Sequence, residues 1–194
     1  VVAAGANHSL ALDGGTVLAW GINNDGDLGD GTTRNRSLPV SLSFPLSVEA
    51  IDGGADHTLA LLSDGSLMAW GENESGELGT TAVCTSDDCY SSSPVAAGDF
   101  TLVVDVSAGS GQSAAVREYG NVFMWGRNYG VNPVMITGMS NIVDVELGQN
   151  HALALDSSGV VFGWGSNGAG ELGTGDYVDS SRPVVVSGLP RIVD

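Results

Sequence analysis

Three histidines, His8, His57 and His151, each open a copy of the same short motif: HSLAL, HTLAL and HALAL. Imidazole nitrogens bind zinc, so three histidines at equivalent positions raise the hypothesis of a three-histidine metal site. The fourth copy, QSAAV, opens with Gln112, a residue that forms hydrogen bonds but is a poor transition-metal ligand. A buried side chain that hydrogen-bonds between strands suits all four positions. We therefore predict a structural role for His8, His57, Gln112 and His151.

Two loop segments resemble ligand-binding motifs. Gly168–Gly173, GAGELG, fits the pattern G-x-G-x-x-G, but a dinucleotide site needs those glycines to open a helix, and Thr174-Gly175-Asp176 follow instead. Asn23–Gly31, NNDGDLGDG, is rich in calcium-type ligands. However, its acids miss the EF-hand spacing, and Arg36 stands where the bidentate glutamate would be. We predict no cofactor, with a weak surface calcium ion as the alternative.

Nucleophilic catalysis is not indicated by this sequence. Every histidine belongs to the recurring motif, so no Ser/His/acid or Cys/His set can be assembled around one. Paired carboxylates are plentiful, but they lie in polar loops where solvation is the default interpretation. We predict that the protein is not an enzyme.

The recurring motif is part of a longer unit that the chain contains four times. Each copy runs on to a Trp-Gly pair, and each pair is followed by a Pro-Val anchor; the anchors are Trp20, Trp70, Trp125, Trp164 and Pro39, Pro94, Pro133, Pro183. Length changes fall almost entirely between Trp and Pro, and correcting for them gives a unit of about 50 residues. We expect one array with repeats at approximately 1–47, 48–101, 102–141 and 142–194.

Each unit predicts short strands rather than helices. An apolar run leads into the histidine segment, a turn with Gly follows, and a second apolar segment ends at Trp-Gly. A polar loop with Gly-acid-Leu-Gly then leads to the Pro-Val strand, except in the third unit, which lacks this loop. The four equivalent tryptophans, Trp20, Trp70, Trp125 and Trp164, are predicted to pack in the core.

The combined pattern AG-xx-H-SLAL-xx-DG-x-V-xx-WG-x-N-xx-G-x-LG…P-V resembles the regulator of chromosome condensation repeat along the whole chain. The resemblance implies an all-β fold of β-propeller blades with about four antiparallel strands each. Members of that family usually close with seven blades, whereas this chain holds four repeats. We therefore expect an open or partial propeller, whose unpaired strand edges would need further blades or a partner.

Both cysteines, Cys84 and Cys89, lie in the enlarged loop of the second unit. A local disulfide and two free thiols are both compatible with this spacing, and we favour the disulfide, which would imply an oxidising compartment. The loop sequons at Asn35 and Asn73 are candidate glycosylation sites. Together these features favour an extracellular or cell-surface location.

The charge is strongly one-sided, with 23 acidic residues against six basic ones and a net charge of −17. Such a surface repels phosphate backbones, so nucleic-acid binding is not expected. No apolar run is long enough to cross a membrane, so no membrane insertion is expected.

Two classes of function fit these features. The first is a non-enzymatic extracellular scaffold whose partners are proteins, above all copies of itself joined head to tail. The second is a regulator that binds one protein on a propeller face. Two models of regulation follow from the family resemblance: inhibition of a secreted enzyme and nucleotide exchange on a small GTPase.

Overall fold

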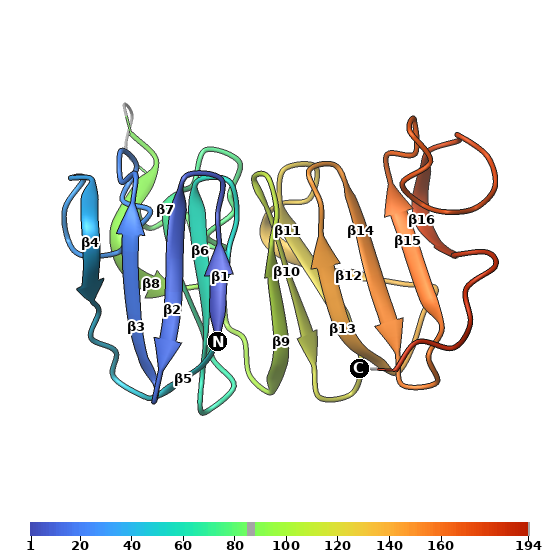
Figure 1. Cartoon of the computed structure of the whole chain (residues 1–194), viewed down its shortest axis with the longest axis horizontal. Helices are drawn as coiled ribbons and strands as arrows, with labels where there is room; N and C mark the ends of the chain where they lie inside the picture. The colour runs from blue at the N-terminus through green and yellow to red at the C-terminus, as the bar shows by residue number, and fades with distance from the viewer. Residues whose placement is uncertain (85–87, 194) are drawn as a thin grey trace.

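The structure, a computed structural model, describes residues 1–84 and 88–193, which form sixteen strands in four sheets of four. Each sheet is an antiparallel meander built from consecutive strands, and we call the sheets blades I to IV (Figure 1). The prediction of four-stranded β-propeller blades is confirmed. No helix in the described ranges is long and apolar enough to cross a membrane.

The blades follow the repeat units in order. Blade I contains β1 (Val2–Ala4), β2 (His8–Asp13), β3 (Thr16–Gly21) and β4 (Arg36–Ser41). Blade II contains β5 (Val48–Gly53), β6 (His57–Leu62), β7 (Leu67–Glu72) and β8 (Tyr90–Ala96). Blade III contains β9 (Val103–Ala108), β10 (Gln112–Arg117), β11 (Val122–Gly126) and β12 (Gly130–Ile136). Blade IV contains β13 (Ile142–Leu147), β14 (His151–Asp156), β15 (Val161–Gly165) and β16 (Ser180–Val185).

The first strand of each blade lies on the inner side of the array. Strand β5 contacts both β1 and β9, and β9 contacts β13, so the inner strands adjoin in chain order. Figure 1 shows the four blades side by side, with the outer strands β4 and β16 at the two ends of the row. This arrangement is a partial propeller in which only neighbouring blades pack face to face.

The Trp-Gly pair marks a bulge at the same place in every blade. The register between the third and fourth strands shifts at Trp20, Trp70, Trp125 and Trp164. The following glycine has a positive φ in each case, for example 99° at Gly71. An L side chain is strained at this φ, so the bulge requires glycine.

Adjacent blades share hydrophobic clusters. The cluster between blades I and II joins Leu10 and Val17 to Trp70, and the cluster between blades II and III joins Leu59 and Leu61 to Trp125. A third cluster joins blade III to Trp164 of blade IV. Each blade therefore depends on its neighbour for its apolar core, as expected of a repeat array.

The blades have two distinct ends. The loops that follow Trp-Gly lie at one end, which we call the loop end. The β2–β3, β6–β7 and β10–β11 turns lie at the opposite end, because each hairpin strand spans the blade once.

Candidate protein-interaction face

A chain of polar contacts joins blade I to blade II at the loop end. His8 Nε2 lies 3.0 Å from Thr58 Oγ1, and this hydroxyl donates to the Asp27 carbonyl oxygen at 3.1 Å. Trp70 Nε1 donates to the same carbonyl at 2.9 Å. The loop of blade I is thus bonded to the histidine strand and the Trp-Gly strand of blade II.

The same contacts recur between blades II and III. His57 Nε2 lies 2.9 Å from Ser113 Oγ, which donates to the Glu77 carbonyl at 2.7 Å. Trp125 Nε1 donates to that carbonyl at 2.8 Å. Burial lowers the pKa of His8 to about 4 and that of His57 to about 3, so both imidazoles are neutral at pH 7.

These contacts are absent between blades III and IV in the described structure. Gln112 Nε2 donates within its own blade, to the Arg127 carbonyl at 3.0 Å, and Ala152 stands where Thr58 and Ser113 provide hydroxyls. Blade III also lacks the loop that would supply the carbonyl. Trp164 Nε1 is therefore buried without the loop carbonyl that accepts from Trp70 and Trp125, and it interacts instead with the Tyr129 side chain, beside a cavity of about 60 Å³.

The calcium-like segment at 23–31 is organised by an asparagine. Asn23 Oδ1 accepts a hydrogen bond from Leu28 N, and its Nδ2 donates to the Thr32 and Arg34 carbonyls. Arg36 pairs with Asp30 at 2.6 Å. Within the described ranges no group of three or more His, Cys, Asp or Glu side chains is placed to hold a metal ion.

Asparagines equivalent to Asn23 recur in the repeat pattern after Trp-Gly, but the pattern alone assigns them no role in ordering the loop. Asn73 and Asn167 accept from Leu78 N and Leu172 N in the same way as Asn23 does from Leu28 N. The signal was the fixed spacing of five residues from Asn to the loop Leu.

The burial of Asn73 also corrects one glycosylation site. Asn73 is 2% exposed and its Nδ2 donates to the Thr80 carbonyl, so a glycan on this nitrogen does not fit the folded loop. The sequon residue Asn35 lies in an exposed loop, where its Oδ1 accepts from Asn23 N.

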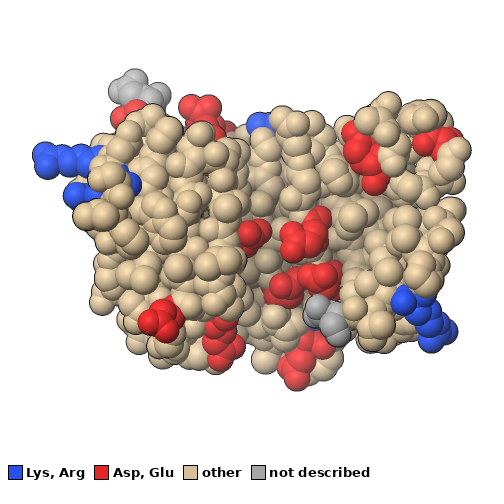
Figure 2. Space-filling model, in the orientation of Figure 1, with Lys and Arg blue, Asp and Glu red and all other residues tan. Residues whose placement is uncertain are grey.

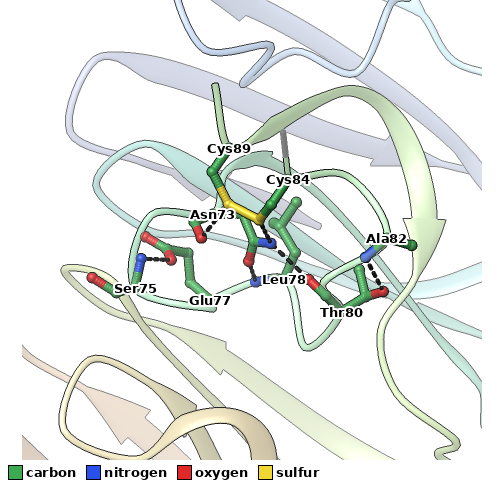
Figure 3. Close-up of a disulfide and its surroundings, with 8 residues drawn as sticks. All are labelled: Asn73, Ser75, Glu77, Leu78, Thr80, Ala82, Cys84 and Cys89. Atoms are coloured by element: carbon green, nitrogen blue, oxygen red, sulfur yellow. Dashed lines mark hydrogen bonds between the residues drawn. A yellow bond between two sulfur atoms is a disulfide. The ribbon is translucent and has the colours of Figure 1, made fainter. Parts of the chain in front are cut away.

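The two cysteines form a disulfide, Cys84–Cys89, as expected from the sequence. Figure 3 shows it directly above Asn73, whose carbonyl oxygen lies 3.0 Å from Cys89 Sγ and whose Nδ2 lies 3.4 Å from Cys84 Sγ. The same view shows Glu77 turned back to accept from Ser75 N at 2.8 Å. The disulfide therefore closes the enlarged loop over the asparagine that organises it.

Carboxylates concentrate at the loop end of blades I and II. Burial, together with the charges of Asp56 and Asp25, raises the pKa of Asp27 to about 7. Burial and the carboxylates of Glu77, Asp56, Glu74 and Asp25 likewise raise the pKa of Glu72 to about 7. We call these residues the loop-end acidic cluster: Asp25, Asp27, Asp56, Glu72, Glu74 and Glu77.

A second group of carboxylates lies on the inner strands. Asp52 Oδ2 accepts from Ala108 N at 2.7 Å, and Asp105 Oδ2 accepts from Val145 N at 2.9 Å, so each carboxylate bonds the inner strand of the next blade. Burial raises the pKa of Asp105 to about 7. Figure 2 shows acidic atoms in the middle of the face that β9 and β13 occupy in Figure 1.

Comparison with known families decides what kind of propeller this is. The model of the regulator of chromosome condensation (RCC1) repeat matches residues 14–61, 64–116 and 158–194, and a second model of that repeat matches residues 48–77 and 142–171. The chain belongs to the RCC1 repeat family. Residues Trp20, Trp70 and Trp164, each followed by Gly, fall within the matched ranges of this RCC1 chain.

Individual relatives agree with this assignment. The ultraviolet-B receptor UVR8 of Arabidopsis thaliana is 32% identical in an alignment 137 residues long, which covers 66% of this chain and 29% of the receptor. Protein pim1 of Schizosaccharomyces pombe is 33% identical over 149 residues, 67% of this chain and 28% of pim1.

Among solved structures, human WBSCR16 superposes with a TM-score of 0.89 at 28% identity, over 100% of this chain and 54% of the human chain. Prp20p of Saccharomyces cerevisiae, whose structure was described with its binding to Gsp1p and histones, superposes with a TM-score of 0.80 at 22% identity. This superposition covers 97% of this chain and 50% of the Prp20p chain. This RCC1 chain thus spans about half the length of the propellers that it resembles and under a third of the two curated relatives.

Proposed function

We propose that this RCC1 chain is a non-enzymatic protein-binding module whose loop end takes a basic surface of a partner protein. The observation that carries the proposal is the loop-end acidic cluster, where carboxylates from the loops of two blades adjoin. Asp27 is 2% exposed, and its Oδ1 makes no hydrogen bond within the described chain. A buried carboxylate oxygen without a donor is costly unless a cationic or hydrogen-bonding group meets it.

The overall charge supports the same partner chemistry. A net charge of −17 attracts basic surfaces over distances of about a Debye length, roughly 8–10 Å at physiological salt. The fold-level likeness to Prp20p, which was described with its binding to Gsp1p and histones, provides a basic protein suitable as a probe.

The test compares two variants of equal net charge. The loop-end variant carries Asp25→Asn, Asp56→Asn and Glu74→Gln. The control carries Asp13→Asn, Glu49→Gln and Glu118→Gln, three exposed carboxylates at or near the opposite end. With purified core histones as the probe, the loop-end variant should bind at least tenfold more weakly than the natural sequence, and the control within about threefold. Equal losses in the two variants would show only non-specific charge attraction and would refute the proposal.

A structural scaffold outside the cell is the second candidate. The disulfide Cys84–Cys89 favours an oxidising compartment. The contact between blades I and II needs a histidine and a Gly-acid-Leu-Gly loop from one blade and a hydroxyl and a tryptophan from the next. Blade IV has the first half, His151 and the loop that ends at Gly173, and blade I has the second half, Ser9 opposite Trp20. A blade from the rest of a longer chain, or from a second copy, would complete these halves.

Light scattering over a concentration series separates this candidate from the first. If copies associate through the outer faces of blades I and IV, the average molar mass of the natural sequence should rise with protein concentration. The mass of Trp20→Ala should stay close to that of the monomer. A constant monomer mass in both proteins would leave the scaffold without support.

A further inference from the structure

The loop-end contacts between blades I–II and II–III have the same backbone geometry, which allows a position-by-position comparison. The residue after Trp-Gly donates its N–H to the carbonyl of the residue before the histidine position in every blade. Glu72 N donates to Asp56 O at 2.8 Å, and Arg127 N donates to Gly111 O at 2.7 Å. Glu72 and Arg127 are therefore equivalent, and so are Asp56 and Gly111.

The charges at these equivalent positions differ in sign. Between blades II and III, the loop acid Glu77 faces blade III, where Arg127 places its guanidinium over Gly111: a methyl group added at Gly111 would lie 3.3 Å from Arg127 Nη2. The positive charge of Arg127 opposes the rise that burial causes in the pKa of Glu77. The contact between blades II and III therefore contains its own cation, Arg127.

Between blades I and II the cation is missing. The negative charges of Asp56 and Asp25 add to the effect of burial on the pKa of the loop acid Asp27. The same two carboxylates also act on Glu72 of blade II. Glu72 thus stands in place of Arg127 and Asp56 in place of Gly111, and Asp27 Oδ1 is a buried oxygen without a partner in the described structure. Like charges this close favour a ligand that carries a positive charge.

We propose that Asp56 and Glu72, which are partly exposed, form with the buried Asp27 a receptor site for an arginine side chain of the partner protein, which takes the place that Arg127 fills at the next contact. We choose a guanidinium group as the ligand because the protein itself places one, that of Arg127, near Glu77 at the contact between blades II and III. Guanidinium is also planar and weakly hydrated and bonds carboxylates with a fixed fork of donors. The inference rests on the proposed function, and it names the group that the loop end recognises.

The site predicts a specific preference among small probes. In ¹⁵N-HSQC titrations with Ac-Gly-Arg-Gly-NH2, the amide signals of Asp25–Gly29 and Glu72–Ser75 should shift. The citrulline counterpart, which has nearly the same shape and no charge, should bind at least tenfold more weakly. Equal binding of the two peptides, or shifts outside these loops only, would overturn the site.

Two charge reversals provide the matched test within the protein. Glu72→Arg supplies the missing cation internally, so it should raise Tm by about 2–4 °C and weaken binding of the arginine peptide at least tenfold. Glu171→Arg makes the same charge change in the exposed loop of blade IV and should leave binding within about threefold. Glu72→Gln, a milder change, should weaken binding without the gain in Tm, which keeps the test decisive if Glu72→Arg folds poorly.

The outcomes separate this inference from the proposed function. Equal weakening by Glu72→Arg and Glu171→Arg would refute the arginine site, while histone binding at the loop end would still stand on its own measurement. Stabilisation by 1 mM CaCl₂ that is lost in Asp27→Asn, with no preference for arginine over citrulline, would make the site a metal site and overturn the inference.

Discussion

The most informative residues are those that join one blade to the next. His57 is 1% exposed, and its Nε2 meets Ser113 Oγ, which in turn bonds the carbonyl of the Glu77 loop. Such a series of hydrogen bonds is stable only when each buried polar group has a partner. The protein lacks the equivalent contacts between blades III and IV, so it tolerates the loss of one set.

Removing one hydroxyl tests this arrangement. Ser113→Ala leaves the buried His57 Nε2 without a partner, so the free energy of unfolding should fall by about 1–3 kcal/mol in urea denaturation. Ser9→Ala is the control, because Ser9 stands at the equivalent position of blade I, opposite Trp20, and the described chain has no preceding blade to bond its hydroxyl; its effect should stay within about 0.5 kcal/mol. Equal effects would show that the chain of contacts does not stabilise the blades.

The inner-strand carboxylates predict a pH dependence with a definite sign. The pKa of Asp105 is raised from its ordinary value near 3.8 to about 7, so the folded state binds more protons than the unfolded state between these values. Stability from this group therefore falls as pH rises from about 4 to about 7. Asp105→Asn removes that loss and should become more stable relative to the natural sequence as pH rises, by on the order of 2 kcal/mol at pH 8.

The control for this measurement has the opposite sign. Hydrogen bonds from Ser66 lower the pKa of the Asp64 carboxyl, which thus adds stability at neutral pH that is lost in acid. Asp64→Asn should be relatively less stable at pH 8 than at pH 3. Comparing each variant with the natural sequence is essential, because the buried His8 and His57 also titrate, with lowered pKa values. Parallel pH curves for Asp105→Asn and the natural sequence would contradict the assignment.

At the scale of elements, the sequence pattern identified the strands and the loops well. The nearly constant offsets from the histidine position to Trp-Gly, and from Pro-Val to the next histidine position, follow from the four-stranded blade, because the bulge glycine and the paired strands allow little change in length. Length changes fall in the loop between Trp-Gly and Pro-Val. The pattern could not place Asp27 of blade I near Asp56 of blade II, since their proximity depends on how two blades pack. It also gave Asn73 as a loop sequon and a candidate glycosylation site, whereas in the structure Asn73 Oδ1 accepts from Leu78 N and this hydrogen bond orders the loop.

The disulfide loop is an element with a local role. Closing a loop between residues five apart stabilises a chain by about 2 kcal/mol in the entropy model. Reduction should therefore speed hydrogen exchange in residues 73–84 and 88–93 and leave blade III unchanged, as measured by mass spectrometry. Faster exchange throughout blades II and III would show that the disulfide supports the whole array and would contradict a local role.

At the scale of the whole molecule, the two ends of the propeller differ in chemistry. The loop end combines asparagine-ordered loops with an excess of carboxylates, of which Asp27 has no cation beside it in the described structure, whereas the hairpin turns at the other end carry separate, solvated acids. A scaffold that presents mainly acidic loops is suited to electrostatic recognition of a protein surface. Membership of the RCC1 repeat family agrees with a binding role but does not select the partner.

The most direct test of this account is a hydrogen-exchange footprint of the protein bound to core histones. The account predicts protection confined to the loop end of blades I and II, at residues 22–35 and 72–83. The turns at 13–16, 63–66 and 118–121 should exchange as they do in the free protein. Protection at those turns, or on the inner strands alone, would contradict recognition through the loop-end acidic cluster.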